Sequence, residues 1–220
     1  MSGLVDALVA SNEDLWVALA AHPWVRALAD GDLPETALVA WAQQCRLFCQ
    51  LERRALLRLQ ASAPPPELEP LLERLLDDAQ REARQLAEML KSLGAPVTSE
   101  PWPMCLGYGS YVQCCASEGL LEGMAAICAV ERSYLDTWAT LLPSVPSGSR
   151  WREWVENWSA PPFQELVGGI CSSFEELAGT PSAAGRARLE LIFRIVACWE
   201  LEFWEMCWRR RGWSHLQERS

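Results

Sequence analysis

Histidine is nearly absent from this sequence: 220 residues contain only His22 and His215. A zinc site of clustered cysteine and histidine, or a di-iron site of Glu-x-x-His motifs, therefore lacks its ligands. Only His22 lies where it could be a haem ligand, and its simpler role is to fix a helix bend next to Pro23. We expect no bound metal and no cofactor.

Long apolar runs are also missing, since none approaches the roughly 18 residues that a membrane span needs. The N-terminus has no basic start and carries Asp6, Glu13 and Asp14, unlike a signal peptide, so we expect a cytoplasmic protein. The net charge of −10 repels phosphate groups. We therefore expect no nucleic-acid partner and no membrane association.

Strand patterns are absent too, because alternation of apolar and polar residues never persists and β-branched residues are sparse. Helical spacing predicts an all-α bundle in one domain over 1–220, with 209–220 a polar tail. We predict that Asp32 caps the second helix. The predicted helices are 11–28 with a break at His22–Pro23, 34–62, one from after the 63–66 turn to Gly94, 107–116, 120–142, 148–157, 162–178 and 182–208.

Nine cysteines occur without any Cys-x-x-Cys motif, and their number is odd. In a reducing compartment such cysteines are best interpreted as small buried apolar side chains. The twelve tryptophans are expected to anchor the core or an interface. They supply enough apolar surface for a homo-oligomer, either a dimer or a tetramer.

No phosphate-binding glycine loop and no nucleophile-elbow motif is present, so the chemistry must come from acids within apolar helices. In the helix over 120–142, Glu131 shares one face with Cys128, Tyr134 and Trp138. Burial raises the pKa of a carboxyl group, which suits it to general acid or base catalysis near neutral pH. Glu131 is therefore a candidate catalytic residue.

The last predicted helix carries a second candidate acid, Glu200, on a face with Phe203, Trp204 and Cys207. Glu202 and Glu205 point elsewhere and are expected in solvent. Two carboxyl groups on facing helices can divide the acid and base roles. The structural alternative is that Glu131 pairs with Arg132 or Arg194, and Glu200 with Arg46.

Further polar groups lie near the same faces. Gln44 lies close to the face of Trp41 and Phe48, where an amide can bind a ligand or tie two helices together. Tyr111 can stack on a flat ligand or sit in the core with its hydroxyl bonded. Asp78 and Glu82, four residues apart, are expected to form a solvated charged flank.

Four segments together resemble the TenA (thiaminase II) family over essentially the whole chain. They are HPWVRALADGDLP at 22–34, WAQQCRLF at 41–48, GYGSY at 107–111 and ELEFWEMCW at 200–208. AVERSYLDTW at 129–138 is similar to the branch of the family that has glutamate in place of a nucleophilic cysteine. The resemblance implies a haem-oxygenase-like helical bundle without haem.

The family's thiaminase II members hydrolyse the aminopyrimidine breakdown product of thiamin, which returns it to thiamin synthesis. The resemblance therefore implies a pyrimidine-like ligand and no metal. Glu131 takes the place of the branch-defining glutamate and Glu200 that of the closing-helix acid. The implied substrate-binding residues are Gln44, Phe48, Tyr111, Cys128, Tyr134, Phe203 and Trp204.

One departure from the family concerns its Gln-Asp pair, which aligns with Gln43-Gln44. An amide in place of the ring-binding carboxylate removes a contact of about 1–3 kcal/mol. Hydrolysis of an aminopyrimidine or formylaminopyrimidine is the first hypothesis, and a ligand-binding protein without turnover is the second. A metal-dependent oxidase is disfavoured by the scarcity of histidine.

Overall fold

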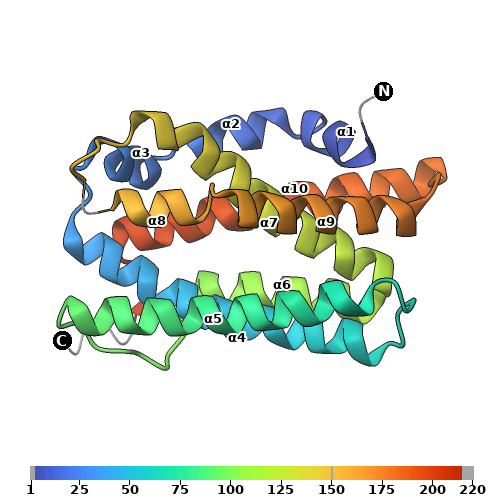
Figure 1. The fold of residues 1–220 in the computed structure, drawn as a ribbon, viewed down its shortest axis with the longest axis horizontal. Coiled ribbons are helices and arrows are strands. Elements are labelled where there is room, and N and C mark those ends of the chain that lie inside the picture. The colour runs from blue at the N-terminus through green and yellow to red at the C-terminus, as the bar shows by residue number, and fades with distance from the viewer. Residues whose placement is uncertain (1–2, 150, 215–220) are drawn as a thin grey trace.

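The computed structural model describes residues 3–149 and 151–214, and within these ranges the ordered elements are all helices. Figure 1 shows them as a bundle with short connections. The helices are α1 (Leu4–Ala10), α2 (Glu13–Ala21), α3 (Pro23–Asp30), α4 (Glu35–Ala61), α5 (Glu69–Ser92), α6 (Pro103–Glu118), α7 (Leu120–Leu141), the 3-10 turn η1 (Leu142–Ser144), α8 (Arg152–Asn157), α9 (Pro161–Ala178) and α10 (Ala183–Arg209).

The predicted all-α bundle is confirmed, and three details differ. The chain has an additional first helix, α1, which is only seven residues long. α6 begins at Pro103, four residues before the predicted start, because a proline suits the first turn of a helix. Asp32 does not cap α4: the residue at its N-cap is Pro34, which makes no side-chain cap.

The predicted break at His22–Pro23 is confirmed, as is the role of His22 in it. His22 ends α2 and caps α3, where its Nδ1 accepts a hydrogen bond from the Trp24 backbone N–H at 3.2 Å. Its Nε2 faces Glu205 at 3.5 Å. His215 lies outside the described residues. The structure therefore gives His22 the capping role expected from the sequence.

Two groups of helices pack across a shared core. α4 packs against α5 and α6, while α7 packs against α9 and α10, and α10 also contacts α4 and α6. In Figure 1, α4–α6 form the lower layer and the remaining helices the upper one. α5 makes most of its contacts with α4. One flank of α5 therefore faces the upper layer, and the site described below lies there.

The upper part of the core is a cluster of aromatic rings, which we call the tryptophan cluster. Its members are Trp24, Trp41, Tyr134, Trp138, Trp158 and Trp204, drawn from four helices and the turn after α8. Trp138 is fully buried and lies 5.3–6.2 Å, between ring centroids, from four other members. Contacts of this kind contribute to stability beyond the effect of the buried area.

No described helix is long and apolar enough to cross a bilayer.

The loop between α5 and α6 is fastened to the middle of α4. The fully buried Gln44 accepts a hydrogen bond from the Trp102 backbone N–H at 2.7 Å through Oε1, and its Nε2 donates to Glu100 O at 3.4 Å. Gln43 donates to Pro96 O at 2.8 Å, and Arg46 donates to Thr98 O. Both the carbonyl oxygen and the NH₂ group of the Gln44 side chain are thus used to hold this loop.

Candidate functional site

A cleft lies between the two layers and consists of two adjoining chambers. The inner chamber, of about 40 Å³, is bounded by α4, α6, α7 and α10. The outer chamber, of about 340 Å³, lies between α5, the end of α8 and the start of α9. The residues that border both chambers are Glu52, Glu82, Glu131 and Phe163. Three of the four are acids, so the junction is the most acidic part of the cleft.

Helical periodicity explains which α4 side chains reach the inner chamber. Trp41, Cys45, Phe48, Cys49 and Glu52 recur at three- and four-residue steps and share one face. α7 presents Glu131 and Tyr134 in the same way, and α10 presents Glu200 and Phe203. An amphipathic pattern normally buries only apolar groups. Here each of the three helices also brings an acid to the chamber.

Glu131 and Glu52 are the most strongly perturbed acids of the cleft. Burial and then the charges of Glu52 and Glu82 hold the pKa of Glu131 well above its ordinary value. Burial and the charge of Glu82 raise the pKa of Glu52 to about 8, partly offset by its interaction with Glu131. One Glu52 oxygen has no hydrogen-bond partner. Neutral carboxyl groups are therefore held at the junction near neutral pH.

Glu200 lies deeper in the inner chamber and is 5 % exposed. Burial raises its pKa to about 7. The Tyr108 hydroxyl makes no hydrogen bond of normal geometry, but it is close enough to the Glu200 carboxylate to lower that pKa somewhat. Glu200 is therefore partly ionised near neutral pH, while burial and the neighbouring acids favour the protonated form of Glu131.

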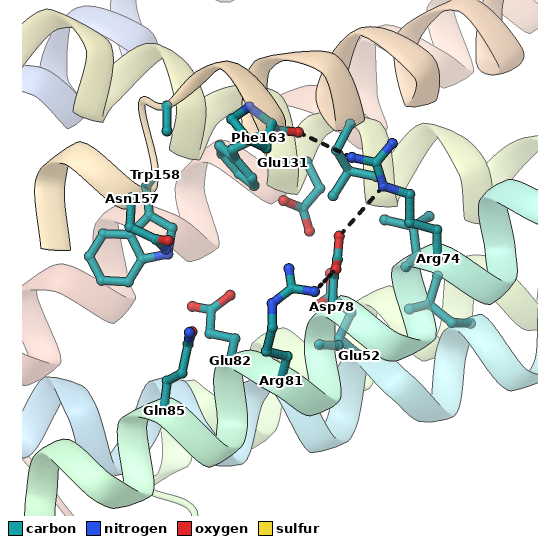
Figure 2. A pocket seen from close by; sticks show the side chains of 16 residues that line it. Glu52, Arg74, Asp78, Arg81, Glu82, Gln85, Glu131, Asn157, Trp158 and Phe163 are labelled. Carbon is teal, nitrogen blue, oxygen red and sulfur yellow. Dashed lines mark hydrogen bonds and ion pairs between the residues drawn. The ribbon is translucent and has the colours of Figure 1, made fainter.

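Glu82 reaches the junction from the opposite side, on α5. Burial raises its pKa to about 7, while the Cys45 thiol and the Trp158 side chain lower it. The Cys45 Sγ lies 3.8 Å from a Glu82 oxygen. Figure 2 shows Glu82 and Asp78 rising from α5 toward Glu131 and Trp158. These two residues are charged as expected but only partly exposed, because they border the outer chamber rather than open solvent.

Basic residues stand only at the outer chamber, and they are engaged there. Arg74 lies 4.0 Å from Asp78 and donates to Pro162 O at 3.2 Å, and Arg81 also pairs with Asp78 (Figure 2). No arginine or lysine lines the inner chamber among the described residues. Acids without paired cations favour a ligand that carries positive charge or several N–H donors.

Flat side chains form the remaining walls of the inner chamber. Phe48 lies 4.5 Å from Tyr108 and 6.1 Å from Phe203, measured between ring centroids. Phe163 closes the junction from α9. These rings form an apolar wall directly behind the acidic junction, as is typical of small-molecule sites with a few polar groups.

The structure brings five of the nine predicted site residues together. Both acids line the inner chamber, as do Phe48, Tyr134 and Phe203. The pairings offered as an alternative for the acids are wrong: Arg132 pairs with Asp136 and Asp6, Arg194 with Asp14, and Arg46 bonds the α5–α6 loop. The acids are therefore left without basic partners.

The other four predicted residues, Gln44, Tyr111, Cys128 and Trp204, do not line either chamber. Gln44 is turned to the α5–α6 loop, and one residue further on the helix Cys45 faces the chamber. Tyr111 contacts Cys115 on the far side of α6, while Tyr108, one turn earlier, lines the chamber. Cys128 faces α9, and Trp204 belongs to the tryptophan cluster. None of the four is placed to touch a ligand in the cleft.

Sequence reasoning missed several cleft residues, among them Glu52, Glu82, Cys45 and Tyr108. Cys45 and Tyr108 carried a usable signal, because each lies at helical spacing from a predicted site residue: Cys45 three before Phe48 and Tyr108 three before Tyr111. Glu82 carried no such sequence signal, because its charged neighbours make this part of α5 resemble a solvent-exposed helix face.

One group of described side chains could also hold a metal ion. The Cys45 Sγ, the Cys49 Sγ and a Glu82 oxygen lie within 4.8 Å of one another. Both thiols are raised in pKa, that of Cys45 to about 11, since burial and the Glu82 charge outweigh the hydrogen bond from Cys49. Both thiols carry their protons at neutral pH without a metal, so a metal would bind here only with release of those protons.

Comparison with known proteins decides the family. The TENA/THI-4/PQQC family matches residues 10–210. The chain belongs to this family. Among its relatives, an aminopyrimidine aminohydrolase of Halalkalibacterium halodurans is 26% identical over 92% of this chain and 94% of that protein. Another, of Bacillus subtilis, is 26% identical over 90% of this chain and 87% of that protein.

Solved structures of TenA homologues show the same fold. The TenA homologue of Pyrococcus furiosus superposes with a TM-score of 0.87 at 23% identity, over 93% of this chain and 99% of that one. A TenA homologue from P. horikoshii gives 0.81 at 24% identity, over 94% and 99%. The expected TenA-like bundle is therefore confirmed.

Proposed function

We propose that this TenA-family protein is a hydrolase of thiamin salvage that cleaves an exocyclic C–N bond of an aminopyrimidine or formylaminopyrimidine. The proposal is supported by two relatives named aminopyrimidine aminohydrolase. The observation that carries it is the meeting of Glu131 and Glu200 in one chamber with flat walls and no cation.

The two acids differ in pKa, and this difference suggests their roles. Burial and the neighbouring acids raise the pKa of Glu131 and so favour its protonated form, which donates a proton to the leaving amine. Glu200, with a pKa of about 7, is substantially ionised and accepts a proton from water. The water oxygen forms the new C–O bond as the C–N bond breaks, and the nitrogen leaves protonated. No cofactor is required by this scheme.

The sizes of the chambers suggest where each reactant lies. The inner chamber, of about 40 Å³, has room for water beside Glu200 but not for a ring. The outer chamber is large enough for a substituted pyrimidine next to Phe163 and Trp158. The ring would then direct its exocyclic amine to the acidic junction. There Glu82, which is partly ionised, accepts hydrogen bonds from the amine.

The test is release of ammonia from the aminopyrimidine by the purified protein. We expect turnover in the wild type, none in a Glu131→Gln, Glu200→Gln double variant, and wild-type turnover in Glu202→Gln, whose side chain is exposed on the same helix. Turnover in the double variant would refute the assigned chemistry.

The second candidate is binding without turnover. It is favoured by one observation: Gln44, which stands where the family resemblance places a ring-binding carboxylate, bonds the α5–α6 loop and lines neither chamber. Calorimetry with the pyrimidine separates the candidates, since heat of binding without ammonia release supports the second. The homo-oligomer and the cytoplasmic location stay predictions, and six of the twelve tryptophans are already buried within the single chain.

A further inference from the structure

Two cysteines outside the cleft face each other across a helix interface. Cys128 lies on α7 and Cys171 on α9, and their Sγ atoms are 3.7 Å apart. A disulfide needs about 2.05 Å between sulfurs, so the two sulfurs must come closer for a bond to form between them. The proposed hydrolysis uses neither residue.

The two thiols have unequal surroundings. Cys128 is fully buried, whereas Cys171 is partly exposed. The hydrogen bond from Cys128 and the charge of Arg132 lower the pKa of Cys171, against burial and the charge of Glu175. The same hydrogen bond, together with burial, raises the pKa of Cys128. Cys171 therefore loses its proton first and is the thiol that solvent can reach.

We propose that Cys171 is a site of oxidation by hydroperoxides and that Cys128 converts the oxidised product into a disulfide joining α9 to α7. An accessible thiolate beside a second, buried thiol is the arrangement of a redox-sensitive cysteine with its resolving partner.

The chemistry proceeds in two steps. The Cys171 thiolate attacks one peroxide oxygen, the O–O bond breaks, and sulfur gives up two electrons to form a sulfenic acid, with hydroxide leaving. The Cys128 sulfur then attacks the Cys171 sulfur, and the S–O bond breaks as the disulfide forms. The Cys128 proton leaves with that oxygen as water. The peroxide is the only oxidant needed.

The other close pair, Cys45 and Cys49, is an internal comparison. Both are buried in the cleft, and both have raised pKa values, so neither supplies a thiolate at neutral pH. Cys198 is exposed but belongs to no close pair in the described structure. Peroxide should therefore act at Cys171 in preference to these three.

The experiment treats the folded, reduced protein with limiting hydrogen peroxide and maps its peptides without reduction. We expect a cross-linked peptide containing Cys128 and Cys171, an intact mass lower by about 2 Da, and recovery with dithiothreitol. If the cross-link joins Cys45 to Cys49 instead, or if no cross-link forms, the proposal is refuted.

Variants assign the roles of the two sulfurs. Cys171→Ser should lower the cross-linked fraction at least tenfold, and Cys128→Ser should stop the reaction at a sulfenic acid that dimedone traps on Cys171. Cys198→Ser should form the same cross-linked fraction as the wild type. Dimedone trapping on Cys128 rather than Cys171 would overturn the assignment. The mapping of the wild-type protein decides the proposal even if a variant folds poorly.

Discussion

The tryptophan cluster and the acidic cleft share three helices, α4, α7 and α10, and have opposite characters. α4 gives Trp41 to the cluster and Glu52 to the cleft, and α10 gives Trp204 and Glu200. α7 contributes Trp138 and Glu131, two turns apart. The cluster gains free energy from burial, whereas the cleft buries charges at a cost. The difference indicates that packing of the tryptophan cluster stabilises the fold. The acidic cleft can then hold its carboxyl groups without basic partners.

Substitution of Glu131 should show most clearly that the acidic cleft serves activity while the tryptophan cluster serves stability. Glu131→Gln keeps the shape but removes the proton donor, so we expect the rate of ammonia release to fall about 10²- to 10⁴-fold. The melting temperature should not fall, since a costly buried acid is replaced by a neutral group. Steady-state kinetics and thermal unfolding measure the two effects. Glu122→Gln, on the same helix outside both chambers, is the control.

Substitution of Trp138 should show the reverse pattern. Trp138→Ala empties the centre of the cluster, and we expect a loss of about 3–5 kcal/mol in the free energy of unfolding. At a temperature where the variant is folded, its rate constant should stay within a few-fold of the wild type, since Trp138 touches neither chamber. Urea unfolding gives the first number. A loss of activity as large as that of Glu131→Gln would contradict this division of roles between the tryptophan cluster and the acidic cleft.

The cost of burying Glu200 should appear as a pH dependence of stability. Its pKa rises from 4.5 to about 7 on folding, so between these values the folded state binds more protons than the unfolded state. The free energy of unfolding therefore falls as pH rises from about 5 to 8, by about 3 kcal/mol from this group. Glu200→Gln should remove that part of the slope and equal the wild type near pH 4.5. An unchanged slope in the variant would show that Glu200 is not the group responsible.

Substitution of Gln44 should have the smallest effect on activity and stability, because this α4 residue belongs to neither the tryptophan cluster nor the acidic cleft. Gln44→Asp restores the carboxylate that the family resemblance suggests. We expect KM to stay unchanged and stability to fall by about 1–2 kcal/mol, because Trp102 and Glu100 lose their bonds to the amide. A marked fall in KM would show that this position reaches the ligand after all. Gln43→Ala, which affects the same loop, is the matched comparison.

The helices and the two central acids could be predicted from sequence, because both depend on local periodicity. Glu131 and Glu200 stood out as charges on apolar stripes, and they line one chamber. Gln44 could not be placed in this way. A single residue turns about 100° around a helix, so neighbours that look equivalent in sequence face different partners. The short α1 gave too brief a pattern to be recognised.

Glu82 was beyond sequence reasoning for a different reason. Its neighbours Asp78 and Arg81 form an ion pair on α5, as an exposed helix face does. Glu82 is partly enclosed by Trp158 and Phe163, which lie more than 70 residues later in the chain and line the same chamber. Such long-range cover leaves no trace in the periodicity of α5.

The fastening of the α5–α6 loop by Gln44 has a consequence for the order of folding. The bond from Trp102 to Gln44 spans 58 residues and closes α4, α5 and α6 into a unit that contains no later part of the chain. Contacts between successive helices form faster than those between distant ones. We therefore expect these three helices to associate first, bringing Glu52 and Glu82 near each other while water still reaches both. Docking of α7 and α10 then expels that water. The free-energy cost of removing water from the acidic cleft is therefore incurred late on the folding pathway.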